Sequence, residues 1–157
     1  MPKPLWAPWR LEYVQNTDEL DHCIFCDPEE ELLVHRGAHA LIVLNKFPYS
    51  PGHLLIAPHR HLGDFEQLSD EEALEVHRFC ARGIAALRAE YAPHGHNLGW
   101  NLGRVAGAGI EDHVHLHVVP RWNGDTSFMP VLADVKVLPE ALERTAERLR
   151  PHFASAI

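Results

Sequence analysis

The alternation of three histidines with aliphatic residues in His113-Val114-His115-Leu116-His117-Val118-Val119 constrains the fold of this chain most strongly. A period of two is typical of a β-strand, in which successive side chains point to opposite faces of the sheet. We therefore expect the three imidazoles on one face and Val114, Leu116 and Val118 on the other. A strand face given over to imidazole indicates metal binding, or acid, base and nucleophilic chemistry near neutral pH.

The remaining hydrophobic patterns predict strands on both sides of a long helix. Apolar runs bounded by proline and glycine predict strands at residues 32–34, 38–44, 53–57 and 97–102. Ser69 and Glu72 fit the capping box of a helix over residues 70–91, whose apolar stripe is Ala73, Val76, Cys80, Ile84 and Leu87. A second helix is expected from Pro139, a favoured first-turn residue. This order predicts an α+β fold with a mainly antiparallel sheet.

Length and charge set the limits of the functional interpretation. The 157 residues, 46% of them hydrophobic, predict one domain over 1–157, with an irregular arm at 1–20 and a helix-bearing C-terminal extension at 131–157. We see neither a secretory signal nor an apolar run near the roughly 20 residues that cross a bilayer, so we expect a cytoplasmic protein without membrane contact. The formal net charge of −8 argues against binding to duplex nucleic acid but not against a small phosphorylated ligand.

Two interpretations of the three histidines remain open from the residues alone. Together they could hold one catalytic zinc ion with an open fourth position. Alternatively, one could be a nucleophile toward phosphorus, while its neighbours orient it and transfer protons. The glycine-rich loop that precedes them, with Gly103, Gly107 and Gly109 around Arg104, favours the second interpretation, because closely approaching backbone N–H groups bind phosphate.

The segment Cys23-Ile24-Phe25-Cys26 is a separate signal. Two cysteines at this spacing occur in half of a zinc site and in redox pairs, and no thioredoxin-like pattern accompanies them here. A zinc site would need two further ligands. The third cysteine, Cys80, is expected to be a small core residue of the long helix.

Three segments together resemble the histidine-triad (HIT) superfamily. The stretch 113–119 has the triad pattern, Asn45 through Pro51-Gly52-His53-Leu54-Leu55-Ile56 resembles the nucleoside-binding hairpin, and Asn101-Leu102-Gly103 resembles the phosphate loop. The resemblance covers roughly residues 20–122. It implies a HIT-like fold with an antiparallel sheet of about five strands, one long central helix and a C-terminal helix. Members of the superfamily are usually homodimers, and tetramers are a further option.

The resemblance also implies roles for individual residues. His115 would be the nucleophile that attacks the α-phosphorus of a nucleotide and forms a nucleotidyl-imidazole intermediate. His117 would contact the phosphate or assist proton transfer, and His53 would lie beside the phosphates. Asn45 would bind the ribose. The other expected substrate contacts are Asn101 at the α-phosphate, the loop glycines Gly103, Gly107 and Gly109, and Trp122, which is either a wall of the substrate site or a core anchor.

Several HIT branches combine a pair of cysteines at this spacing with two histidines around a zinc ion. By position, the resemblance assigns His61 and His113 to join Cys23 and Cys26. The zinc would be structural and closed to substrate. His59 is the rival to His61, because only spacing and resemblance separate the two.

Two segments outside the triad and one departure from the pattern of HIT hydrolases indicate the branch of the superfamily. Gly109 stands where many HIT hydrolases carry glutamine, four residues before the first histidine. Residues 5–10 and 120–130 resemble bacterial HIT-type diadenosine tetraphosphate phosphorylases, which use inorganic phosphate to form ATP and ADP. We therefore expect a nucleotidyltransferase acting on dinucleoside polyphosphates, with inorganic phosphate as the acceptor and no organic cofactor.

Three alternatives to phosphorolysis remain. The first is hydrolysis of dinucleoside polyphosphates. The second is hydrolysis of nucleoside phosphoramidates, which is disfavoured because no serine lies between Ser69 and the triad. The third is a nucleotide-binding sensor with little turnover.

Overall fold

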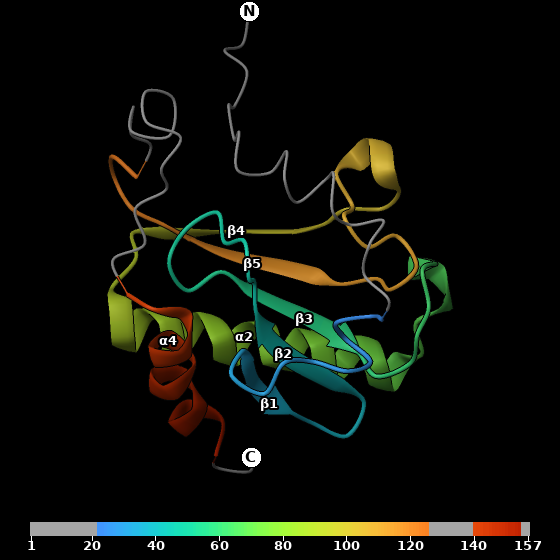
Figure 1. Ribbon diagram of the computed structural model, residues 1–157, viewed down its shortest axis with the longest axis horizontal. Helices are drawn as coiled ribbons and strands as arrows, with labels where there is room; N and C mark the ends of the chain where they lie inside the picture. Colours follow the sequence, from blue (N-terminus) through green and yellow to red (C-terminus); the bar gives the residue numbers. More distant parts are fainter. Residues whose placement is uncertain (1–21, 126–139, 155–157) are drawn as a thin grey trace, which may run out of the picture.

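The computed structural model describes residues 22–125 and 140–154 (Figure 1). The expected arm at 1–20 lies outside these residues, and the C-terminal extension at 131–157 is described only over 140–154. Five strands form one sheet in the order β1-β2-β3-β5-β4, and every neighbouring pair is antiparallel. Their bounds are β1 Leu33–Arg36, β2 Ala40–Leu44, β3 Leu54–Pro58, β4 Gly95–Trp100 and β5 Leu116–Arg121. The predicted α+β fold with a five-stranded antiparallel sheet is confirmed.

The long helix α2 spans Asp70–Tyr91, as its capping signals predict. The Ser69 side chain accepts from the backbone N–H of Glu72, and the Glu72 side chain accepts from the backbone N–H of Ser69. The predicted apolar stripe is wrong at Ala73, which is exposed, whereas Glu72 is only 4% exposed. Glu72 is buried because its carboxylate binds the Arg60 guanidinium at 2.6 and 2.7 Å.

The C-terminal helix α4 spans Leu142–Leu149 and continues into a 3-10 turn, Arg150–Phe153. It begins three residues after the predicted start at Pro139, which is outside the described part of the chain. Arg150 secures it, because Nε donates to the Leu33 carbonyl at 2.9 Å. Within 22–125 and 140–154, no helix is both long and apolar enough to cross a membrane.

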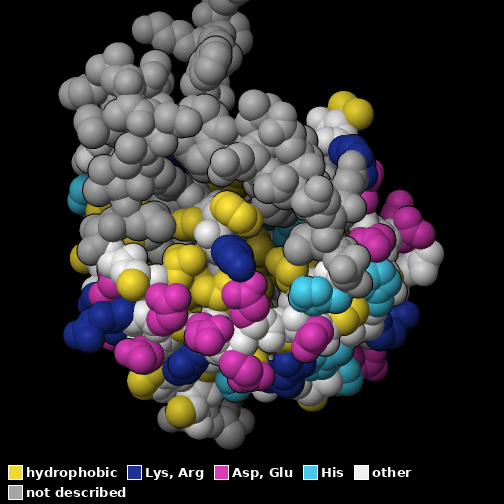
Figure 2. All heavy atoms as spheres, in the orientation of Figure 1, with side chains coloured by type: hydrophobic (Ala, Val, Ile, Leu, Met, Phe, Trp, Pro, Cys, Tyr) yellow, Lys and Arg dark blue, Asp and Glu magenta, His cyan; other side chains and the backbone are white. Residues whose placement is uncertain are grey.

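The two faces of the sheet are covered differently (Figure 1). The helix face packs against α2 and α4 and contributes Ala40, Ile42, Leu44, Leu54, Ile56, Leu116 and Val118 to the larger buried core. The opposite face, here called the site face, is crossed by the segment that precedes β1, and its smaller core comprises Phe25, Leu41, Val43, Leu55 and Ala57. Figure 2 shows apolar side chains in the middle of the molecule and, below them, acidic side chains interspersed with basic ones.

The predicted histidine strand is shorter than expected, although Leu116 and Val118 join the core on the helix face as the alternation predicts. Only His117 of the three histidines lies within β5, which begins at Leu116. Ahead of it the backbone leaves the ladder, and the Val114 N–H donates to the Leu62 carbonyl at 2.8 Å. The neighbouring strand β3 ends at Pro58, which has no N–H to continue the pairing. The strand predicted at 97–102 is observed as β4, so Asn101 lies in the loop that follows it.

Candidate active site and metal-binding group

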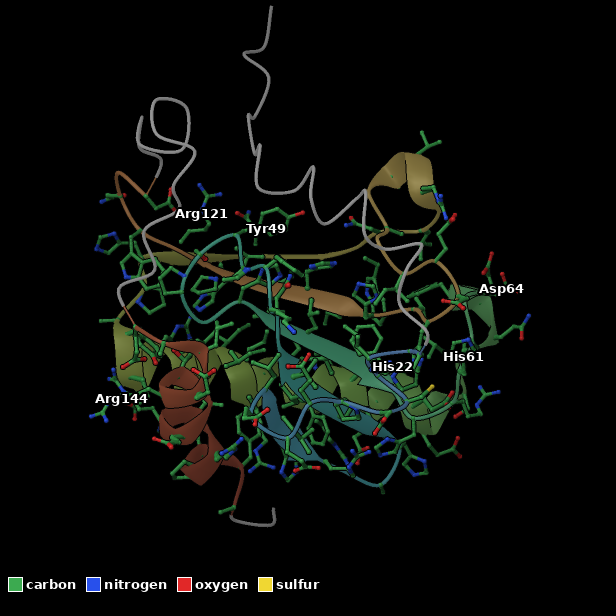
Figure 3. All side chains as sticks on the ribbon, in the orientation of Figure 1. His22, Tyr49, His61, Asp64, Arg121 and Arg144 are labelled. Atoms are coloured by element: carbon green, nitrogen blue, oxygen red, sulfur yellow. The ribbon has the colours of Figure 1, made fainter. Side chains whose placement is uncertain are left out.

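The site is assembled on the site face from four separate segments of the chain. These are the cysteine turn (residues 23–26), the loop between β2 and β3, the loop after β3 that carries His61, and the histidine segment 113–117. Figure 3 shows Tyr49 on the loop between β2 and β3, and His61 beside the segment that carries the cysteine turn. The site therefore exists only in the folded chain.

His115 is held in one tautomer by the main chain. Its ring is 6% exposed, and Nδ1 lies 2.8 Å from the carbonyl oxygen of His113. A carbonyl oxygen can only accept, so Nδ1 carries the proton and Nε2 carries the lone pair. Burial lowers the pKa of His115, which keeps the ring neutral. Such an imidazole is suited to nucleophilic attack through Nε2.

A relay of hydrogen bonds fixes the proton positions of His53 and His117. The backbone N–H of Tyr49 donates to His53 Nδ1 at 3.1 Å. His53 Nε2 must then carry the proton, which it donates to His117 Nδ1 at 3.0 Å. Neutral His117 consequently has its proton on Nε2. The Asn45 side-chain amide also lies 3.4 Å from His53 Nδ1, so Asn45 joins the same group.

Phe25 connects the cysteine turn to the histidines. Its ring is 1% exposed. The ring centroid lies 4.8 Å from that of His115 and 5.1 Å from that of His113. The His115 ring centroid also lies 4.9 Å from that of His117. Phe25 was not predicted as a site residue, because its only sequence signal is its place between two cysteines.

Four side chains form a group that could hold a metal ion. The ligand atoms of Cys23, Cys26, His61 and His113 all lie within 4.8 Å of one another. His113 Nδ1 is 3.2 Å from the Cys23 sulfur, and His61 Nδ1 is 3.4 Å from the Cys26 sulfur. Two thiols and two imidazoles are a donor set that zinc takes in closed tetrahedral sites. Neither His115 nor His117 belongs to this group, so the arrangement does not favour one catalytic zinc held by all three histidines.

Neighbouring acceptors prepare both imidazoles for a metal. The carbonyl oxygen of Pro58 accepts from His113 Nε2 at 2.8 Å. The carboxylate of Asp112 lies 3.2 Å from His61 Nε2. Each contact places the proton on Nε2 and leaves the Nδ1 lone pair directed at the cysteines, as in metal sites whose histidines are oriented by a carbonyl or a carboxylate. Neither acceptor was predicted from the sequence.

The rival ligand His59 is engaged elsewhere, because its Nε2 donates to the Gly37 carbonyl at 2.9 Å.

Burial, together with the neighbouring Cys23 and Asp112, raises the pKa of Cys26 to about 11. A divalent cation would reverse this effect, since it stabilises thiolates. The residues present therefore fit zinc.

The glycine-rich loop lies between β4 and the histidine segment. Gly103 and Gly107 have positive φ angles of 83° and 95°, which favour glycine. The Asn101 side-chain amide lies 3.5 Å from the Gly107 carbonyl, and the third loop glycine, Gly109, is half-buried. The Arg104 backbone N–H and its Nε both donate to Glu111, at 2.8 and 3.0 Å, which closes the loop.

Trp122 follows β5 and is half-buried. Its indole N–H donates to the Tyr91 carbonyl at the end of α2, at 3.3 Å. This bond anchors Trp122 to the helix.

Comparisons with known proteins agree with this geometry. The HIT domain family matches residues 29–124, which is more than half of the chain. The chain is 36% identical to an AP-4-A phosphorylase of Mycobacterium tuberculosis, over 96% of this chain and 84% of that protein. It is 27% identical to the adenosine 5'-monophosphoramidase hnt1 of Schizosaccharomyces pombe, over 81% of this chain and 95% of that protein.

Among solved structures, the fold is similar to a zinc-bound histidine triad family protein from Mycobacterium smegmatis. The TM-score is 0.67 at 28% sequence identity, and the match covers 84% of this chain and 93% of that one.

Proposed function

The chain belongs to the HIT domain family, and from this premise we propose that it transfers a nucleotidyl group from a dinucleoside polyphosphate to inorganic phosphate. The observation that carries the proposal is the tautomer of His115. Its proton is held on Nδ1 by the His113 carbonyl, at 2.8 Å, and its Nε2 lone pair is left for a phosphorus atom.

In the first step the Nε2 lone pair of His115 attacks the α-phosphorus of diadenosine tetraphosphate. The bond from that phosphorus to the oxygen bridging to the β-phosphate breaks, and ATP leaves. His117 Nε2–H donates to the departing oxygen, since the His53 contact at 3.0 Å keeps its Nδ1 deprotonated. AMP remains bonded to His115.

In the second step an oxygen of inorganic phosphate attacks the same phosphorus. The P–N bond to His115 breaks, ADP forms, the proton of the attacking hydrogen phosphate passes to His117 Nε2, and both imidazoles are regenerated. The dinucleotide and phosphate together thus yield ATP and ADP. The 36% identity to the Mycobacterium tuberculosis AP-4-A phosphorylase supports this acceptor, and Gly109, which has no side chain, would leave space for it.

Ribose and phosphate contacts are assigned in the same proposal. Asn45 would bind the ribose beside His53, and Asn101 would hold the α-phosphate with Gly103 and Gly107. Trp122 would close the site beyond β5. Zinc bound by Cys23, Cys26, His61 and His113 would be structural, pinning the cysteine turn to the sheet.

The test is product analysis with diadenosine tetraphosphate and phosphate whose oxygens carry the ¹⁸O isotope. We expect ATP and ADP, with the label in the β-phosphate of ADP. Equally fast cleavage to AMP and ATP in phosphate-free buffer would instead identify a hydrolase. The similarity to the Schizosaccharomyces pombe monophosphoramidase makes adenosine 5'-phosphoramidate the second substrate to try.

A further inference from the structure

Phe25 is an aromatic side chain that the proposed chemistry does not use. It lies in the cysteine turn, where the backbone N–H groups of Cys26 and Asp27 both donate to the Cys23 carbonyl, at 3.1 and 3.0 Å. The two cysteine side chains join the metal-binding group. The ring between them is fully buried and faces the imidazoles, at an interplanar angle of 34° to His115.

One hydrogen bond cannot fix the orientation of the His115 ring. The Nδ1–H bond to the His113 carbonyl sets the tautomer but allows the ring to tilt about the N–H···O direction. A tilt would move Nε2 away from the line of attack on phosphorus. The Phe25 and His117 rings, with centroids 4.8 and 4.9 Å away, restrict that tilt by direct packing.

We propose that Phe25 is a positioning residue for His115, and that it transmits the state of the metal-binding group to the nucleophile. The proposal rests on the proposed function, in which His115 attacks phosphorus. A metal held by Cys23 and Cys26 would fix the turn from both ends, and the Phe25 ring would then be fixed against the imidazole. Removal of the metal would free the turn and let the His115 ring tilt.

Two simpler roles make different predictions for Phe25→Leu, which keeps apolar volume but removes the flat ring. If Phe25 only fills the smaller core, the variant loses stability and keeps kcat. If Phe25 is a wall for the nucleobase, KM rises. A positioning role lowers kcat and leaves KM unchanged, because misplacement of a reacting atom by about 1 Å costs on the order of 100-fold in rate.

The first experiment measures kcat, KM, zinc content and melting temperature for wild type and three variants. We expect Phe25→Leu to lower kcat about 10- to 100-fold with KM within about twofold. Phe25→Tyr keeps the ring and should restore most of kcat. Ile24→Val is the matched control in the same turn and should leave kcat unchanged. If Phe25→Leu does not fold, Phe25→Met takes its place.

The second experiment does not depend on turnover. Diethyl pyrocarbonate carbethoxylates accessible imidazole nitrogens, and peptide mass spectrometry compares His115 with the exposed His77 on α2. We expect His115 to react several-fold faster relative to His77 in Phe25→Leu, and also in wild-type protein treated with a zinc chelator. Unchanged His115 reactivity in both cases would overturn the proposal, as would an unchanged kcat in folded Phe25→Leu or a change in KM alone.

The two proposals fail in different ways. If His115→Ala retains turnover, the proposed function is wrong, while the carbethoxylation result still decides whether Phe25 holds the ring. If His115→Ala is inactive and Phe25→Leu behaves as wild type in both experiments, only the role of Phe25 is wrong.

Discussion

The two faces of the sheet bury different kinds of side chain, and they hold them by different interactions. On the helix face, apolar side chains from α2, α4 and the strands pack into one large core, in which no individual contact is directional. On the site face, the imidazoles of His53, His113 and His115 are also buried, yet main-chain groups bind each of them. Burial on the first face supplies stability, whereas burial on the second fixes where protons lie.

The path of the backbone therefore sets the chemistry of the site. The Tyr49 amide and the Pro58 and His113 carbonyls determine which nitrogen of each imidazole carries the proton. Substitutions on the site face should therefore change rate or metal affinity more than stability. Those on the helix face should do the reverse.

The largest effect is expected from replacing the proposed nucleophile on the site face. We expect His115→Ala to lower kcat by more than about a thousandfold, because no covalent intermediate can form. Zinc content should stay unchanged, since His115 is not in the metal-binding group. Kinetics and elemental analysis on the same preparation check both points. Joint loss of zinc and activity would instead favour a catalytic zinc held by the three histidines.

The opposite result is expected on the helix face. Leu149 of α4 is fully buried, and Leu149→Ala should lower the free energy of unfolding by about 2–4 kcal/mol through the lost packing and the cavity left behind. Activity per folded molecule should stay within about twofold of wild type. Denaturant unfolding and kinetics at a temperature where the variant is folded provide the two numbers. A large fall in kcat without a loss of stability would show that the faces are not separate.

Much of this division was visible in the sequence. The alternation at 113–119 predicts which side chains face the helices, and the capping box predicts where α2 begins. The structure brings Cys23, Cys26, His61 and His113 together, the set that the resemblance assigned to zinc. These features are predictable because they depend on local periodicity or on spacing that a known fold preserves.

Other features depend on contacts that no local pattern encodes. Asp112 faces His61, and Phe25 faces His115, only because the folded chain brings distant segments together. The carbonyls of Pro58 and His113 leave no signature at all, since every residue has one. Ala73 was placed on the buried face of α2 by period alone, but the pair of Glu72 with Arg60 occupies the buried position instead.

A smaller effect is expected when an outer contact of the metal-binding group is removed. Asp112→Asn should weaken zinc binding about 10- to 100-fold, because the carboxylate no longer orients His61 or increases its basicity. Competition with a zinc-binding dye measures the affinity. Asp125→Asn is the matched control, because Asp125 pairs with Arg121 outside the metal-binding group. Equal zinc affinity in the two variants would contradict the role of Asp112.

The smallest effect concerns the ion pair that ties α2 to the segment carrying His61. The Arg60 guanidinium lowers the pKa of Glu72 from 4.5 to about 2. Because the folded pKa is below the unfolded one, this stabilisation is present above pH 4.5 and is lost as the pH falls toward about 2. Glu72→Gln should thus lower the free energy of unfolding by about 1–2 kcal/mol at neutral pH, a modest value because Arg60 is half exposed.

The pH dependence of that difference distinguishes the ion pair from simple packing. Urea unfolding of wild type and Glu72→Gln at several pH values should give curves that converge as the pH approaches about 2, where Glu72 is protonated. Glu147→Gln, at an exposed position of α4, should follow wild type closely at every pH. A difference between wild type and Glu72→Gln that stays constant down to low pH would mean that Glu72 acts through shape alone. The pair of Arg60 with Glu72 would then not link α2 to the His61 segment through charge.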